Sequence, residues 1–147
     1  MLVAEVYGLF AVKSVFGSSP VVVLRTEDGR VLPIYIGFAE ALSIYYALRG
    51  DVPPRPMTHD LMVDVISKLN ARVEKIVIDD LIDNTFYARL VLKQNDKTIE
   101  IDARPSDSIA IALRLACPIF VEDEVMDEAG SEELPSEFVD FSEGFGI

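Results

Sequence analysis

Cysteine and histidine are nearly absent from this chain, which has one of each among 147 residues. The single Cys117 excludes disulfides within the chain and suits a reducing cytosol, so we expect a cytoplasmic location. One histidine and one cysteine also exclude a Cys/His metal cluster and make a Cys/His nucleophile–base pair improbable. The sequence contains neither a glycine-rich phosphate loop nor a basic stretch with interleaved aromatic residues.

Long apolar runs are missing as well. No segment approaches the roughly 20 apolar residues of a membrane span, and Glu5 places a charge too early for a secretory signal. We therefore expect no membrane association. Half of the residues are hydrophobic, and 147 residues suffice for one domain with a sizeable core.

Basic residues are absent from the C-terminal part of the chain. Residues 117–147 contain 10 acidic and no basic side chains, whereas residues 1–116 contain 15 acidic and 13 basic ones. We divide the chain into a domain, residues 1–130, and an acidic tail, residues 131–147. Because the tail repels phosphate, we expect it to limit access of nucleic acid. It is either disordered or docked, and Phe138 and Phe141 favour docking on the body or on a neighbouring subunit.

Two similar series of elements are predicted, which makes the fold class α+β. The first series has a strand at 3–12, a loop at 16–20, a hairpin of 21–25 with 31–36 on Asp28-Gly29, and a helix from 37 to about 48, closed by Gly50. An amphipathic helix capped by Thr58 follows. The second series has a strand at 71–78, a hairpin of 85–93 with 97–103, a helix capped by Ser106, and a short strand at 119–121.

The two series correspond at an offset of 67 residues. Residues 4–48 lie over 71–115 without a gap, and Glu40 then falls on Asp107. This match predicts a single domain built from a duplicated strand–hairpin–helix unit with an inserted amphipathic helix, although identities are few and a chance match is the alternative. A two-residue turn at Asn95-Asp96 would place Leu92 opposite Ile99 and Arg89 opposite Asp102.

Paired carboxylates are the first candidate for chemistry. Glu40 and Asp107 each stand at a helix start, and a pseudo-twofold axis would let them hold one divalent cation such as Mg²⁺ or Mn²⁺. Hydrolysis of a phosphodiester by metal-activated water would then be feasible. The alternative is that each carboxylate only complements the dipole of its own helix.

A second polar cluster lies at 55–60. His59 is a candidate general base or metal ligand with Asp60 beside it, or else a histidine that is merely hydrogen-bonded. Arg55 and Arg104 follow rigid or strand-ending segments and could position phosphates. Arg104 could equally be a local partner of Asp107.

Three blocks of sequence resemble the signature blocks of the bifunctional nuclease family. They are Leu32-Pro-Ile-Tyr-Ile-Gly-Phe-Ala-Glu40, Arg55-Pro-Met-Thr-His-Asp-Leu61 and Asp102-Ala-Arg-Pro-Ser-Asp-Ser-Ile-Ala-Ile-Ala-Leu-Arg114, and the resemblance covers about residues 2–128. It implies a compact α+β domain with nuclease activity on DNA and RNA. Matching the blocks nominates eight residues without assigning their roles. From their chemistry we predict catalytic residues (Glu40, His59, Asp60, Asp107) and substrate-binding residues (Arg55, Thr58, Arg104, Ser106), with the repeat-related Glu40 and Asp107 as the metal pair.

The sequence therefore predicts a nuclease that hydrolyses DNA and RNA with the help of a divalent metal. The alternative is a non-catalytic binding module for a small anionic ligand or a protein partner, which the absence of a basic patch favours. We also expect a homodimer, because the helices at 38–48 and 106–116 are apolar nearly all round, with Tyr45 or Tyr46 near the interface.

Overall fold

Groups of strands and helices follow one another along the chain in this computed structural model, which describes residues 1–147. In chain order the elements are β1 (Leu2–Ser14), β2 (Gly17–Thr26), β3 (Val31–Tyr35), α1 (Phe38–Arg49), α2 (Thr58–Lys68), β4 (Ala71–Ile82), β5 (Thr85–Gln94), β6 (Lys97–Ala103), α3 (Pro105–Leu115), β7 (Ile119–Val121), α4 (Asp123–Ala129), β8 (Val139–Asp140) and α5 (Phe141–Phe145). The predicted α+β class is confirmed. None of these helices combines the length and the hydrophobicity needed to cross a membrane.

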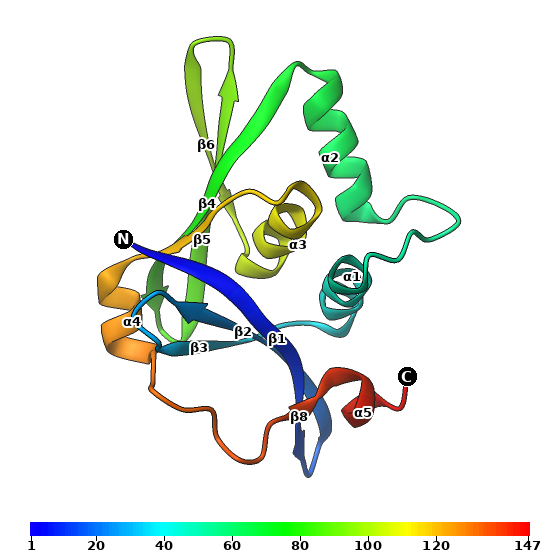
Figure 1. Ribbon diagram of the computed structural model, residues 1–147, viewed down its shortest axis with the longest axis vertical. Coiled ribbons are helices and arrows are strands. Elements are labelled where there is room, and N and C mark those ends of the chain that lie inside the picture. The colour runs from blue at the N-terminus through cyan, green and yellow to red at the C-terminus, as the bar shows by residue number, and fades with distance from the viewer.

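One sheet contains all the strands, in the order β3-β2-β1-β7-β4-β5-β6, with β8 paired to β1. Strands β1, β2 and β3 form one antiparallel group, and β4, β5 and β6 form another. Strand β7 joins the two groups, since it pairs antiparallel with β1 and parallel with β4. Helices α1, α2 and α3 lie together beside this sheet (Figure 1).

The offset of 67 residues relates the two groups of strands and their helices. It carries α1 onto residues 105–116, which matches α3 at Pro105–Leu115, and it carries β2 onto residues 84–93, which matches β5 at Thr85–Gln94. Both units have the same strand order. The common architecture agrees with the offset, and duplication as its origin stays a prediction.

The predicted register of β5 with β6 is confirmed. Leu92 pairs with Ile99 and Arg89 pairs with Asp102 across the ladder. The Arg89 guanidinium, however, forms its ion pairs with Asp79 and Glu100, each at 3.0 Å, rather than with Asp102. Cross-strand position therefore predicted the backbone pairing correctly but not the ion pairs of the long side chain.

The main core lies between the sheet and the helices and comprises 23 buried residues. Helix α1 contributes Ala41 and Ile44, and α3 contributes the continuous segment 109–112. The two helices pack against each other, so much of the apolar surface that suggested a partner subunit is covered within the chain.

Three predicted boundaries are wrong. The segment 16–20 is mostly strand, because the pairing of β1 with β2 extends to the pair of Ser14 and Gly17. Gly17 adopts a φ of 105°, which allows a tight turn between the two strands. Ser106 does not cap α3, since Pro105 occupies the first helical position and makes Arg104 the N-cap. Thr58 does not cap α2 either, because the cap is Met57, whose N–H donates to Asp60 at 2.8 Å.

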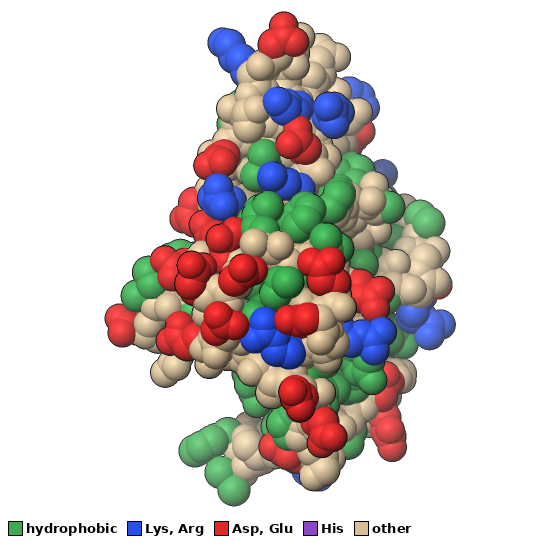
Figure 2. All heavy atoms as spheres, turned by 60° about the vertical axis from the view of Figure 1, so that its left-hand side comes forward, with side chains coloured by type: hydrophobic (Ala, Val, Ile, Leu, Met, Phe, Trp, Pro, Cys, Tyr) green, Lys and Arg blue, Asp and Glu red, His purple; other side chains and the backbone are tan.

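The acidic tail is docked on the body, as predicted, and the disordered alternative is wrong. Strand β8 pairs with β1, and the α5 residue Phe141 is fully buried in the main core. Phe138 packs beside Phe10, with 6.2 Å between ring centroids. Figure 2 shows acidic side chains outnumbering basic ones on the face where α4 lies. That the tail limits access of nucleic acid stays a prediction.

Candidate functional site

The N-terminal ends of α1, α2 and α3 meet around one pocket of about 190 Å³. Its lining comes from all three helices and comprises Ala39, Glu40, Ser43, Met57, Thr58, His59, Arg104 and Asp107. The fold therefore gathers polar residues from the three sequence blocks into one place.

A chain of hydrogen bonds runs through this pocket from α1 to α3. His59 Nδ1 lies 2.7 Å from the hydroxyl of Ser43, and His59 Nε2 lies 2.8 Å from Oδ1 of Asp107. With its proton on Nε2, the ring donates to Asp107 and accepts from the Ser43 hydroxyl. Ser43 and His59 are only 2% and 5% exposed, so these bonds fix the imidazole in a buried position.

Arg104 completes the chain on the solvent side. Its Nε donates to Oδ2 of Asp107 at 2.8 Å and its second terminal nitrogen donates to Oδ1 at 3.2 Å, the fork geometry of an arginine–carboxylate pair. The first terminal nitrogen lies 3.8 Å from Oε1 of Glu40. The Arg104 side chain is nevertheless 65% exposed. It therefore links the two predicted carboxylates and still faces the solvent.

Asp107 is held in its charged form. Burial raises the pKa of this carboxyl, but hydrogen bonds from Arg104 and His59 outweigh it and leave the pKa below its usual value. The same hydrogen bond with Asp107 raises the pKa of Arg104. Asp107 is thus an anion at neutral pH, with both oxygens already accepting hydrogen bonds.

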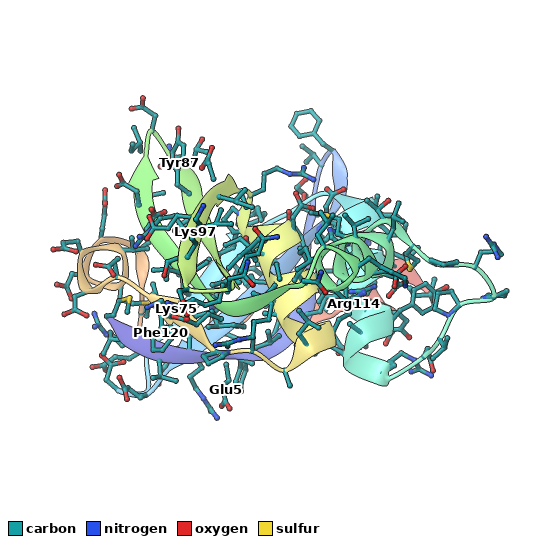
Figure 3. All side chains as sticks on the ribbon, turned by 90° about the horizontal axis from the view of Figure 1, so that it is seen from above. Glu5, Lys75, Tyr87, Lys97, Arg114 and Phe120 are labelled. Atoms are coloured by element: carbon teal, nitrogen blue, oxygen red, sulfur yellow. The ribbon has the colours of Figure 1, made fainter.

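Asp60, predicted as a catalytic residue, forms hydrogen bonds to two other parts of the chain. Its two carboxylate oxygens accept hydrogen bonds from the Met57 N–H at 2.8 Å and from the Arg114 Nε at 2.7 Å. Arg114 extends from α3 toward α2 (Figure 3) and also donates to the carbonyl of Ser43 at 3.5 Å. Asp60 therefore ties α2 to α3 and does not line the pocket.

Some of the predicted site residues line this pocket and others lie outside it. Glu40, His59, Arg104 and Asp107 come together, and Thr58 lines the same pocket. Arg55 is exposed on the connection between α1 and α2 and lies outside the lining. Ser106 is buried and lines an adjacent groove, which Arg104 also borders.

Sequence reasoning missed Ser43 and the partner of Arg114. Ser43 is the only polar residue between Ala41 and Tyr46, three positions after Glu40, and that isolation was the available signal. Arg114 was the only polar residue in the apolar part of its helix. An isolated polar residue on a buried helix needs a hydrogen-bond partner, which here comes from a distant segment.

A metal site at this pocket would depend on few protein ligands. No group of three or more His, Cys, Asp or Glu side chains is arranged to hold a metal ion. The pocket does offer the carboxylates of Glu40 and Asp107. Mg²⁺ commonly binds through one or two carboxylates and completes its shell with water and substrate phosphate, so this donor set suits it if Arg104 turns away from Asp107.

The sequence of the chain matches the model of one protein family. The model named Bifunctional nuclease domain matches residues 22–133, most of the chain. The chain belongs to the bifunctional nuclease domain family. The match includes all three helices that line the pocket and ends within the first residues of the acidic tail.

Individual relatives from bacteria and plants agree with the family. An uncharacterized protein of Mycobacterium tuberculosis is 47% identical over 114 residues, which covers 77% of this chain and 68% of the relative. Bifunctional nuclease 2 and Bifunctional nuclease 1 of Oryza sativa subsp. japonica are 36% and 31% identical over 107 and 105 residues. Each match covers more than two thirds of this chain but only about a third of the rice protein.

Proposed function

We propose that the chain is a nuclease that hydrolyses phosphodiester bonds of DNA and RNA at the pocket of Glu40, Arg104 and Asp107. Family membership supports the nuclease class. The observation that carries the proposed site is Arg104, whose exposed guanidinium stands 2.8 Å from Asp107 and 3.8 Å from Glu40 at the mouth of the pocket. A substrate phosphate is the natural partner for a guanidinium in such a position.

In this proposal Arg104 binds the scissile phosphate and Glu40 and Asp107 serve the attacking water. Arg104 exchanges part of its bonding with Asp107 for the incoming phosphate, which releases carboxylate oxygens. Glu40 and Asp107 would hold a divalent cation, which supplies positive charge for the transition state and activates water. The carboxylates orient that water opposite the leaving oxygen.

His59 acts as a positioning residue. Both of its ring nitrogens are occupied, one by Ser43 and the other by Asp107, and the ring is buried. It therefore holds the Asp107 carboxylate toward the pocket, while Ser43 sets the orientation of the ring. Asp60 and Arg114 support this arrangement by fixing α2 against α3.

Cleavage by the purified chain tests the proposal directly. We expect Mg²⁺ or Mn²⁺ to support cleavage of both DNA and RNA, and EDTA to abolish it, because without a cation the two carboxylates repel the phosphate and no group in this proposal lowers the pKa of the attacking water. The measurement is the loss of full-length single- and double-stranded substrates on denaturing gels, with Asp107→Asn protein purified in parallel as the control for contaminating nucleases. Absence of cleavage under every metal condition would instead favour the alternative, a non-catalytic binding module for a small anionic ligand or a protein partner.

Gly37→Ala is expected to lower cleavage without lowering stability. Gly37 is the N-cap of α1, with a φ of −75° that alanine adopts freely, so the folded backbone accepts the change. A Cβ at this position would collide with Oε1 of Glu40, which must then turn away. Alanine is a poorer N-cap residue than glycine, which offsets the gain from a stiffer unfolded chain, so we expect a nearly unchanged melting temperature together with reduced kcat/KM. Full activity in this variant would argue against a role for the Glu40 carboxylate.

We also propose that the chain forms a homodimer. The covered faces of α1 and α3 no longer demand one, but α2 leaves a row of apolar side chains exposed, at Leu61, Val65 and Leu69. Tyr45, one of the tyrosines predicted near the interface, packs on Phe141 within the same chain, with ring centroids 5.5 Å apart. The exposed row of α2 is therefore the better-supported contact surface.

A further inference from the structure

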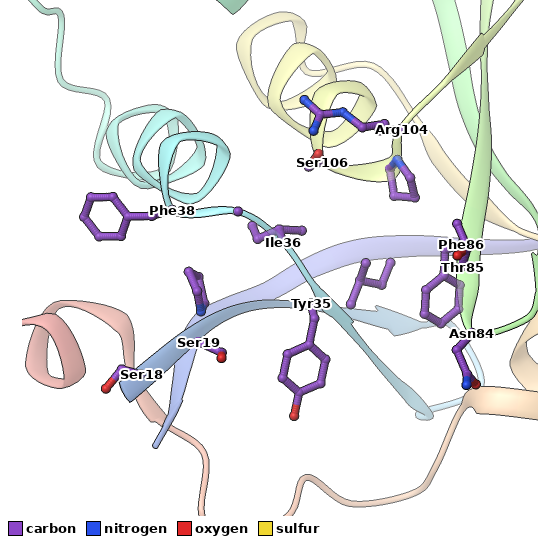
Figure 4. A pocket seen from close by; sticks show the side chains of 14 residues that line it. Ser18, Ser19, Tyr35, Ile36, Phe38, Asn84, Thr85, Phe86, Arg104 and Ser106 are labelled. Carbon is purple, nitrogen blue, oxygen red and sulfur yellow. The ribbon is translucent and has the colours of Figure 1, made fainter. Parts of the chain in front are cut away.

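A second and larger groove, of about 600 Å³, is bordered by Arg104 and lies around the C-terminal end of β3. It is lined by Ser18, Ser19 and Pro20 of β2, the segment 34–38, the segment 84–86 at the start of β5, and Arg104, Pro105 and Ser106. Figure 4 shows Arg104 and the Tyr35 ring on opposite sides of β3, with Asn84 and Phe86 at one end. Apart from Arg104, no residue of this groove has a role in the proposed reaction.

The charge of the groove differs from that of the rest of the molecule. The chain carries 25 acidic side chains and a net charge of −12, yet no Asp or Glu lines the groove. Arg104 is its only charged residue. An anionic ligand would be repelled over much of this protein. Here it meets a neutral wall of hydroxyl and amide groups and the exposed guanidinium of Arg104, whose partner Asp107 lies in the adjoining pocket.

Aromatic rings form the apolar part of the groove. Tyr35 and Phe38 are 59% and 47% exposed although they are large side chains, whereas Phe86, which also lines the groove, packs partly against the main core. Flat exposed rings beside a cation and several hydrogen-bonding side chains match the parts of a nucleotide, which are a flat base, a sugar and a phosphate. In a duplex the faces of the bases are stacked on one another, so rings of this kind favour an unpaired strand.

We propose that this groove binds an unpaired strand of DNA or RNA, with a phosphate at Arg104 and a base on the exposed ring of Tyr35. This inference rests on the proposed nuclease function and specifies its substrate. Because Arg104 borders both the groove and the pocket of Glu40 and Asp107, a strand in the groove presents a phosphate to that pocket. A duplex would gain little here, since one guanidinium neutralises few of its phosphates.

Binding can be measured without cleavage, in EDTA. The probe is a fluorescein-labelled oligothymidylate of about 12 nucleotides, and its fluorescence anisotropy reports the Kd of the single strand. The same strand annealed to its complement reports duplex binding, and thymidine diphosphate as a competitor reports binding of a free nucleotide. We expect the single strand to bind at least about tenfold more tightly than the duplex at low salt.

Tyr35→Ala is expected to raise the Kd for the single strand about 5- to 150-fold, the usual effect of removing one stacking ring. Tyr35→Phe keeps the ring and should bind as the unchanged protein does. Tyr7→Ala is the matched control, because Tyr7 is also a partly exposed strand tyrosine but lines a different pocket. An unchanged Kd in Tyr35→Ala, or equal binding of duplex and single strand, would overturn the proposal.

A pair of asparagines provides a second test that does not depend on removing a side chain. Asn84 and Asn95 both occupy hairpin turns with positive φ, 63° and 55°, and aspartate is nearly the same shape. Asn84→Asp places a negative charge in the groove and should weaken single-strand binding about threefold at low salt. Asn95→Asp, in the β5–β6 turn, should leave it unchanged. Equal effects of the two substitutions would show that only net charge matters and would count against the groove.

The results also separate this inference from the nuclease proposal. Single-strand binding that depends on Tyr35, without cleavage under any metal condition, would retain the groove and refute the nuclease. Cleavage with a Kd and KM that Tyr35→Ala leaves unchanged would retain the nuclease and refute the groove. No measurable binding of any of the three probes would refute the groove as well.

Discussion

Replacing Asp107 by asparagine is expected to lower kcat/KM for nucleic-acid cleavage by at least about a hundredfold. Asparagine has nearly the shape of aspartate but no charge, and its amide nitrogen is a donor. Asp107 accepts from His59 at 2.8 Å and from Arg104 at 2.8 and 3.2 Å, so an amide can satisfy only part of this set. The loss should therefore affect catalysis through both charge and alignment.

The matched control for this substitution is Asp64→Asn. Asp64 lies on the exposed side of α2 and pairs with Lys68 at 2.9 Å, one helical turn away, outside the pocket. Asp64→Asn removes one negative charge, as Asp107→Asn does, and we expect this variant to cleave at the wild-type rate. Kinetics and circular dichroism of both variants check the result. Wild-type cleavage by Asp107→Asn would place the reaction somewhere other than this pocket.

Local sequence patterns predicted the elements that depend on local geometry. The alternation in 97–103 and the turn at Asn95-Asp96 predict the register of β6, because one face must be apolar and the turn must close in two residues. The contact between Arg104 and Asp107 was foreseen for the same reason, since three positions across a helix start lie close together. No distant part of the chain is needed for either conclusion.

Helix starts were predicted less well, because several residues compete for the cap. Ser106 is a favourable capping residue by type, but Pro105 has no N–H and a fixed φ, which suits the first helical position better. The cap therefore moves back to Arg104. The consequence for the site is direct, since the N-cap position points the Arg104 side chain to the pocket and the groove together.

The part of the site that sequence could not predict depends on distant pairing. Ser43 and His59 are separated by 16 residues, and His59 and Asp107 by 48, so no periodicity or motif spacing relates them. Their meeting follows from the packing of α1 and α2 on α3. The same holds for the hydrogen bond between Asp60 and Arg114, which are 54 residues apart. Residue types alone therefore nominated members of the cluster but not the bonds between distant ones.

Replacing Phe141 by alanine is expected to lower the free energy of unfolding by about 3–5 kcal/mol. Phe141 lies in α5 of the tail, is 1% exposed, and packs on rings from α1 and α5. Its centroid is 5.5 Å from that of Tyr45 and 4.9 Å from that of Phe145. Removing this ring would leave a cavity at the edge of the main core and weaken the attachment of the tail.

Thermal and urea unfolding of Phe141→Ala measure this effect, with a fall in melting temperature of about 10 °C expected for a chain of this length. Phe16→Ala is the control, because Phe16 lies in the β1–β2 turn and is 97% exposed, so the change in stability should stay within about 0.5 kcal/mol. Equal stability of the two variants would mean that the tail rests on the body without stabilising it. A large difference makes the acidic tail a structural part of the domain, whose charged side chains face the solvent while its aromatic rings complete the core.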